Sequence, residues 1–245
     1  MFIAGTIRGD TAINLAFHLK NCEGGYNIPE DVNFLVNYGH GILSSADLNG
    51  RIVSNKLTQL QIFRRYGLRT PDFYDIDWNR SRSYTYPLVA RKYHHARGTE
   101  AIFIKTRGSW RKRTRRVNTR HYFVEYIPKE TEFRVHVLGN DAVGISTKSA
   151  FEDRPHPHIW SRDRGWQQID YNGRHSETLR DLGIKACRAL GYDFGAVDIM
   201  LGRDGLFYLL EVNSAPRLNR RRRVLYCDYF RRKYNEKFPR RNGRR

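Results

Sequence analysis

Two short apolar runs in the last quarter of the chain flank a polar turn. Residues 196–201 read AVDIML and residues 206–212 read LFYLLEV, with Gly-Arg-Asp-Gly between them at 202–205. Apolar runs of this length around a glycine-containing turn predict a β-hairpin. Asp198 interrupts the first run, Glu211 lies in the second, and Asn213 follows it directly.

These three polar side chains are expected to meet on one face of the hairpin. Side chains alternate between the two faces of a strand, so Glu211 and Asn213 point the same way, and pairing around the turn brings Asp198 opposite them within a few residues. Such hard oxygen ligands suit Mg²⁺, and two buried carboxylates are costly without a cation or hydrogen-bond partners. The alternative is that Asp198 and Glu211 are solvated residues of an edge strand.

Apolar periodicity predicts the other elements. Two helices, at 54–67 and 176–191, each begin at a serine that caps them and end at a glycine. Strands are expected at 86–92, 122–127, 130–138 and 142–147, and the third alternates polar and apolar side chains, as a half-buried strand does. Residues 151–168 are expected to be irregular. Residues 1–50 carry a short helix and a strand, and form a reduced N-terminal βα segment.

Composition bounds the class of protein. A chain of 245 residues with 40% hydrophobic content can bury a core and form one domain with a lobe or lid. Its three cysteines are widely spaced and odd in number, which favours free thiols in a reducing compartment. The sequence has neither the start expected of a signal peptide nor an apolar run near the roughly 18 residues of a membrane span. We therefore expect a cytoplasmic protein.

The charge of the chain is its most unusual property. The formal net charge is +19 at pH 7, which predicts attraction to an acidic partner. Residues 216–245 hold 13 Arg or Lys against two acids, so they supply 13 − 2 = +11, and residues 107–120 hold seven cations and no acid.

The hairpin also carries a resemblance to a known family. Asp-Phe-Gly-Ala-Val-Asp at 193–198, followed by Leu-Leu-Glu-Val-Asn-Ser-Ala-Pro at 209–216, resembles the metal-binding signature that closes an ATP-grasp domain. The likeness is greatest to the ribosomal-protein glutamate ligases and their relatives, and it covers residues 54–218. A protein kinase is rejected, because no His-Arg-Asp precedes Asp193 and a strand follows it at once.

The resemblance implies an α+β fold in which two α+β lobes grip ATP. The ATP-grasp domain would then cover residues 51–218, with a lid at about 82–125. The segment 1–50 would precede it, and a basic C-terminal tail would occupy 219–245. That tail is expected either to dock a polyanion or to pack as a helix through its apolar residues.

The resemblance also assigns roles to residues. ATP would be held through Lys56 and Arg91 at the phosphates, Gly98 in the phosphate loop, the main chain from Glu125 to Ile127 at adenine, and Glu132 at ribose. Arg134, Arg164 (or Arg162) and Lys148 would be catalytic, and Asp198, Glu211 and Asn213 would hold the metal. For Lys56 and Lys148 the alternative is a solvated surface charge. Arg91 replaces the lysine that is usual in the family, with Lys92 as the alternative residue for that role.

The function implied is that of an ADP-forming ligase that joins a carboxylate to an amine through an acylphosphate. ATP and Mg²⁺ would be its cofactors, with Mn²⁺ as the alternative metal. The net positive charge predicts in addition that the acceptor is an acidic macromolecule (protein, ribosome or nucleic acid). It would be bound through the stretches that run from Arg107 to Arg120 and from Arg217 to Arg245. The alternative is a nucleic-acid or ribonucleoprotein binding protein built on an inactive ATP-grasp scaffold.

Overall fold

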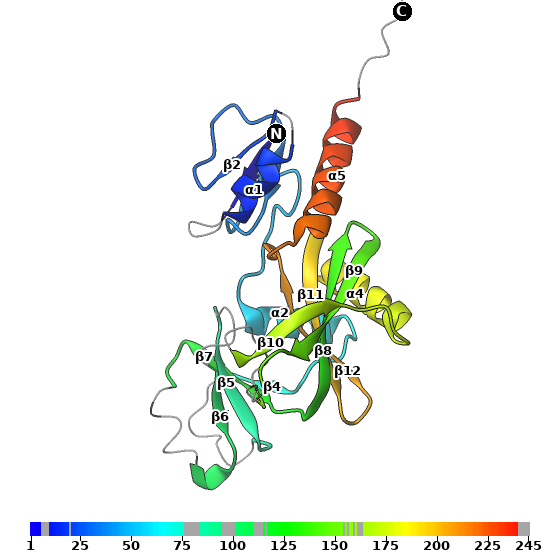
Figure 1. Ribbon diagram of the computed structural model, residues 1–245. Helices are drawn as coiled ribbons and strands as arrows, with labels where there is room; N and C mark the ends of the chain where they lie inside the picture. Colours follow the sequence, from blue (N-terminus) through cyan, green and yellow to red (C-terminus); the bar gives the residue numbers. More distant parts are fainter. Residues whose placement is uncertain are drawn as a thin grey trace, which may run out of the picture.

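Three sheets and four α-helices make up the part of the chain that the structure describes, shown in Figure 1. The computed structural model describes residues 1–5, 10–19, 21–75, 84–94, 101–109, 115, 117–153, 155, 157–158, 160 and 164–239. Gly98 and Arg162 therefore lie outside the described residues.

The N-terminal segment forms a small parallel layer. Strands β1 (Phe2–Ala4), β2 (Glu23–Gly25) and β3 (Leu35–Asn37) pair in the order β2-β1-β3, and α1 (Thr11–Phe17) connects the first two. This is the reduced βα segment that the sequence predicts. Its apolar side chains share one core with the last helix of the chain, so the layer does not stand alone.

A five-stranded antiparallel sheet forms the centre of the molecule. Its order is β10-β9-β8-β11-β12, with bounds Trp166–Asp170, Asp141–Ala150, Lys129–Leu138, Phe194–Gly202 and Phe207–Asn213. Helix α4 (Ser176–Leu190) packs on one face. The approach is close, because a Cβ added to Gly183 would lie 2.8 Å from Val135 Cγ1. The apolar half of each alternating strand is buried on this face, which leaves the polar half for the other face.

A second, smaller lobe carries the third sheet. Strands β4 (Phe73–Tyr74), β7 (His121–Glu125), β5 (Leu88–Lys92) and β6 (Ile102–Ile104) pair in that order, and the short 3-10 helix η2 (Arg107–Ser109) follows β6. Helix α2 (Lys56–Arg65) precedes this lobe in the chain and packs against β12 and α4.

Two expected details at the starts of helices are wrong. The cap of α2 is Asn55 rather than Ser54, because Asn55 Oδ1 accepts hydrogen bonds from the N–H groups of Leu57 and Thr58. Ser176 is the first residue of α4 rather than its cap, and its hydroxyl donates to the Gly173 carbonyl. The region expected to be irregular also differs, since its last residues form β10, which pairs with β9.

The segment predicted as a basic tail is largely a packed helix. Helix α5 (Arg220–Lys237) buries Tyr226, Cys227, Tyr229 and Phe230 against the N-terminal layer and β11. The Tyr226 hydroxyl lies 3.1 Å from His136 Nδ1, and His136 is fully buried, although its strand was expected to leave this face open. The sequence left two possibilities for this segment, docking of a polyanion or packing as a helix. Residues 220–237 pack as a helix.

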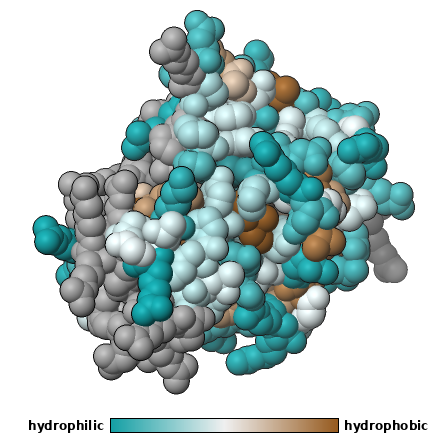
Figure 2. All heavy atoms as spheres, turned by 90° about the horizontal axis from the view of Figure 1, so that it is seen from below, coloured by the Kyte–Doolittle hydropathy of each residue, from teal (hydrophilic) through white to brown (hydrophobic). Residues whose placement is uncertain are grey.

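Figure 2 shows the molecule from below, where the hydrophobic areas are small and separate. Among the described residues, none of the helices is long and apolar enough to span a membrane. Cys22, Cys187 and Cys227 are free thiols, as predicted.

The packing of α5 gives a stability prediction. Phe230→Ala is expected to lower the free energy of unfolding by about 3–5 kcal/mol, because a fully buried ring that contacts Phe194 is replaced by a cavity. Denaturant unfolding measures this loss. Val224→Ala, at a half-exposed position of the same helix, is the control and should stay within about 0.5 kcal/mol of the parent. Equal stability of the two variants would show that α5 is not part of the core.

Candidate active site

One row of polar side chains crosses the face of the central sheet that is opposite α4. Asp198 on β11 is paired directly with Glu211 on β12 and, on its other side, with Arg134 on β8. The hairpin register predicted from the sequence is therefore confirmed for Asp198 and Glu211. A register shift follows immediately between Asp198 and Ile199, and such bulges often re-aim side chains next to functional sites.

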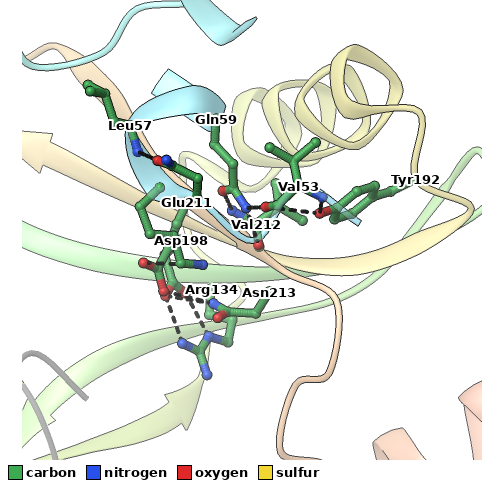
Figure 3. A network of polar contacts seen from close by, with 11 residues as sticks. Val53, Leu57, Gln59, Arg134, Tyr192, Asp198, Glu211, Val212 and Asn213 are labelled. Carbon is green, nitrogen blue, oxygen red and sulfur yellow. Dashed lines mark hydrogen bonds and ion pairs between the residues drawn. The ribbon is translucent and has the colours of Figure 1, made fainter. Parts of the chain in front are cut away.

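Arg134 neutralises Asp198 through two parallel hydrogen bonds. Its Nε lies 2.6 Å from Oδ1 and its Nη2 lies 2.7 Å from Oδ2, and each side chain is 21% exposed. Figure 3 shows this fork pointing at the carboxylate from the neighbouring strand. Burial works against the guanidinium charge, but Asp198 outweighs it and raises the pKa of Arg134. This two-point geometry is the strongest form of carboxylate pairing.

Glu211 and Asn213 complete the group. Asn213 Nδ2 donates to Asp198 Oδ2 at 3.3 Å and to Glu211 Oε1 at 3.1 Å. Lys56, the first residue of α2, places its Nζ 3.6 Å from Glu211 Oε2, and these two side chains are only 11% and 15% exposed. Lys56 is therefore not the solvated surface charge of the alternative interpretation, and neither carboxylate is a freely solvated edge residue.

Helix α2 is fastened to the strand that carries Glu211. The Gln59 side chain donates to the Val212 carbonyl at 3.1 Å and accepts from the Val212 N–H at 2.9 Å, as Figure 3 shows. It also donates to the Val53 carbonyl at 2.7 Å. These bonds hold Lys56 and Glu211 in one geometry, because each lies within a few residues of the clamp.

A second clamp holds the beginning of β11. Asn49, which adopts a left-handed backbone with φ of 55°, accepts at Oδ1 from the N–H of Asp193 at 2.8 Å and donates to the Phe194 carbonyl at 3.0 Å. Its own N–H donates to Asp193 Oδ2 at 2.7 Å. The N-terminal layer thereby fixes the strand on which Asp198 lies.

The donor set of this group fits a hard cation. Two adjacent carboxylates and an amide lie on one face, and an amide can present its oxygen instead of its nitrogen by turning over. Among the described residues, no group of three or more His, Cys, Asp or Glu is placed to hold a metal. A cation here would thus depend on Asp198, Glu211 and Asn213, with water or a ligand's oxygens for the remaining positions.

An apolar group accompanies the polar row. Ile127 on the connection after β7 packs with Met200, Tyr208 and Leu210 from the hairpin. The N–H of Glu125 donates to the Asp72 carbonyl and that of Tyr126 to the Pro87 carbonyl, at 2.7 and 2.9 Å. Of Glu125, Tyr126 and Ile127, whose main chain was assigned to adenine, Ile127 is therefore the one whose N–H has no hydrogen bond to another described residue.

Arg91 on β5 is paired directly with Tyr122 on β7, so the two side chains share one face of the sheet in the smaller lobe. Burial raises the pKa of Tyr122 to about 12, Arg91 opposes this rise and Glu211 adds to it, so the Tyr122 hydroxyl lies within electrostatic range of both. Arg91 also acts, with Lys148, on Lys129. Five cations thus belong to the row or act near it: Lys56 and Arg134 contact its carboxylates, Lys129 binds Glu132, and Arg91 and Lys148 act electrostatically on Lys129.

Lys129 is the member of this group that the sequence reasoning missed. Its ammonium binds Glu132 and lies 4.6 Å from the centre of the Trp160 ring, and its side chain is almost completely buried. Burial lowers the pKa of Lys129, with Glu132 opposing that effect. A lysine at the start of a strand carries no distinctive pattern, so only its spacing of three from Glu132 could have indicated the pair.

The remaining predicted residues lie at different places. Glu132 lies two residues before Arg134, on the same face of β8, and its carboxylate is bound by Lys129. Lys148 lies on the same face of β9, opposite Gln168. Arg164 is exposed and lies just before β10. The structure thus brings Lys56, Glu132, Arg134, Lys148, Asp198, Glu211 and Asn213 to one sheet face, while Arg164 lies in the loop that leads to its edge.

Comparison with known proteins was made by sequence and by structure. No protein-family model matches the sequence. A D-alanine–D-alanine ligase of Stutzerimonas stutzeri (strain A1501) is 27% identical over 194 residues, which cover 73% of this chain and 59% of that protein. The chain therefore spans less than two thirds of the length of this relative.

The structural similarities are more extensive. The crystal structure of D-alanine–D-alanine ligase from Bacillus anthracis complexed with ATP matches 96% of this chain and 97% of its own, with a TM-score of 0.69 and 15% identity. The ATP-grasp ligase PsnB complexed with a minimal precursor matches 82% of this chain and 64% of its own, with a TM-score of 0.60 and 16% identity. The chain has the ATP-grasp fold, and the α+β architecture that the resemblance implied is confirmed.

The Gln59 clamp can be tested by substitution. Gln59→Ala is expected to lower the free energy of unfolding by about 1–3 kcal/mol, because it leaves the buried N–H and carbonyl of Val212 without partners. Chemical denaturation measures the effect. Gln61→Ala, at an exposed position on the same helix, is the matched control. If both variants were as stable as the parent, the clamp would not position the strand.

Proposed function

We propose that this protein is an ATP-dependent ligase that joins a carboxylate to an amine and releases ADP and phosphate. The observation that carries the proposal is the direct pairing of Asp198 with Glu211, with Arg134 and Lys56 at their carboxylates, on the face of an ATP-grasp sheet. The sequence relative and these structural neighbours are ligases, which supports the same reaction class.

ATP and Mg²⁺ are the proposed cofactors. One structural neighbour is complexed with ATP and another, PsnB, with Mg and ADP. In this chain Asp198, Glu211 and Asn213 would hold the metal, which would neutralise the phosphate oxygens of the nucleotide. The apolar group around Ile127 and Met200 would receive the adenine, and Arg91 and Lys56 would face the phosphates from the two sides.

The chemistry divides into two displacements. A carboxylate oxygen of the substrate attacks the γ-phosphorus of ATP, the bond to the β-phosphate oxygen breaks, and ADP leaves. The amine nitrogen then attacks the carbonyl carbon of the acylphosphate, phosphate leaves with the electron pair of the C–O bond, and the amine loses a proton. Arg134, beside the two carboxylates, would stabilise the charge that develops on the transferring phosphoryl group.

The acceptor and the location in the cell stay predictions. Arg220, Arg221, Arg231 and Arg232 of α5 are exposed, so a basic surface is available to an acidic macromolecule, but Arg222 is buried and serves the interior. The cytoplasmic assignment rests on the sequence argument from the cysteines.

The first test removes one metal ligand. Glu211→Gln is expected to keep the fold and to lower ADP formation about a hundredfold or more, the scale of one electrostatic transition-state group. ADP release is measured across a panel of carboxylates and amines, with circular dichroism as the check on folding. Glu130→Gln, at an exposed position on β8, is the control. ADP formation at the parent rate in Glu211→Gln would refute the assignment.

A second test concerns the cation of the smaller lobe. Arg91→Ala should weaken ATP binding more than Lys92→Ala, because adjacent strand residues face opposite sides and Arg91 acts electrostatically on Tyr122 and Lys129. Calorimetric titration with Mg-ATP compares the two variants directly. A larger loss for Lys92→Ala would mean that the other face of β5 meets the nucleotide.

A further inference from the structure

The polar row continues past Arg134 to the far edge of the sheet. Ser146 on β9 is paired with Arg134 on one side and with Asp170 on β10 on the other. Arg222, from the first turn of α5, reaches this edge and places Nη2 2.7 Å from Asp170 Oδ1. The full row across the five strands is therefore Asp170, Ser146, Arg134, Asp198 and Glu211, with Arg222 at its outer end.

Arg222 is a buried cation whose partner is mostly hydrated. Its side chain is 10% exposed, whereas that of Asp170 is 64% exposed. A charge removed from water is compensated best by a partner in the same environment, so Asp170 offsets the cost only in part. The first turn of α5 consists of four arginines without an acid, at the helix end that itself attracts anions. This end of the row has an excess of positive charge.

Two buried polar atoms on the same sheet face have no hydrogen-bond partner among the residues that the structure describes. They are Ser146 Oγ and His136 Nε2, in side chains that are fully buried. A Cβ on Gly144, which is paired with His136 and two residues from Ser146, would lie 3.7 Å from Arg222 Nε. Arg222 thus lies over the face that carries both atoms. Burial, together with Arg222 and Arg134, lowers the pKa of His136 to about 3, in keeping with positive potential here.

We propose that Arg222 binds a second anionic group of the carboxylic acid substrate, so that the enzyme selects acids that carry two anionic groups. The inference rests on the proposed ligase function. The carboxylate that reacts would lie at Arg134, next to the two metal-binding carboxylates, and the second group would lie over Ser146 and share Arg222 with Asp170. Because Ser146 on β9 is paired directly with Arg134 on β8, the two groups are one strand spacing, roughly 5 Å, apart, and a short chain connects them.

Hydroxylamine as the amine allows a direct test without knowledge of the natural acceptor. The full chain is incubated with Mg-ATP, hydroxylamine and acids matched in length: succinate with butyrate, and glutarate with pentanoate. Hydroxamate and ADP are both measured. The dicarboxylates should show the lower KM. Arg222→Gln should raise the KM for the preferred dicarboxylate roughly ten- to a hundredfold, the loss of one charge-assisted hydrogen bond, with a smaller effect on kcat.

Three further variants sharpen the test. Arg222→Lys should restore part of the preference. Asp170→Asn should lower the KM for the dicarboxylate, because it removes the anion that competes for Arg222, and it still decides the question if Arg222→Gln does not fold. Arg188→Gln, which removes an exposed arginine of α4 that donates to the Asn140 side chain, is the control and should leave the KM unchanged.

The outcomes separate the two claims. Equal KM values for each matched pair, or a KM for the dicarboxylate that Arg222→Gln and Asp170→Asn leave unchanged, would overturn the role of Arg222 and leave the ligase function standing. If Mg-ATP binds but neither hydroxamate nor ADP forms with any acid, the ligase function fails, and this inference fails with it.

Discussion

Two carboxylates held side by side in the middle of a sheet are the constraint on which this structure depends. Asp198 and Glu211 are directly paired on neighbouring strands, an arrangement in which like charges repel. Arg134, Lys56 and Asn213 come from three different elements to offset that repulsion. These residues lie on strands or at the start of a helix, and their charges offset one another. Such a set is suited to hold a cation in a fixed position.

The rest of the fold keeps this pair in place. The N-terminal layer fixes the start of β11 through Asn49, and α2 fixes the end of β12 through Gln59. Helix α5 joins the N-terminal layer to the sheet by packing Tyr226 and Phe230 between them. Elements that look peripheral in the chain order are therefore the ones that set the geometry of the carboxylates, because each clamp acts on the backbone next to a site residue.

Much of this site could be predicted from local patterns. The two apolar runs and the turn at 202–205 set the pairing of Asp198 with Glu211, because a short hairpin leaves few possible registers. The alternation of polar and apolar residues along β8 predicted which of its side chains share a face. What could not be predicted depends on contacts between distant elements: the burial of His136 under Tyr226, the place of Lys129 beneath Trp160, and the packing of α5. The choice of Asn55 over Ser54 as a cap was open because both residue types cap helices well.

The central claim is that Asp198 and Glu211 hold a metal ion together with ATP. The alternative is that the pair is left over from an inactive ATP-grasp site on a binding protein. The most direct test of the central claim is the calorimetric affinity of the full chain for ATP, measured with Mg²⁺ and again with the metal removed by a chelator. The account predicts binding at least about tenfold tighter with Mg²⁺, because the metal offsets the repulsion between the phosphates and the carboxylates of Asp198 and Glu211. ATP that binds equally well without a divalent metal, or that does not bind at all, would contradict it.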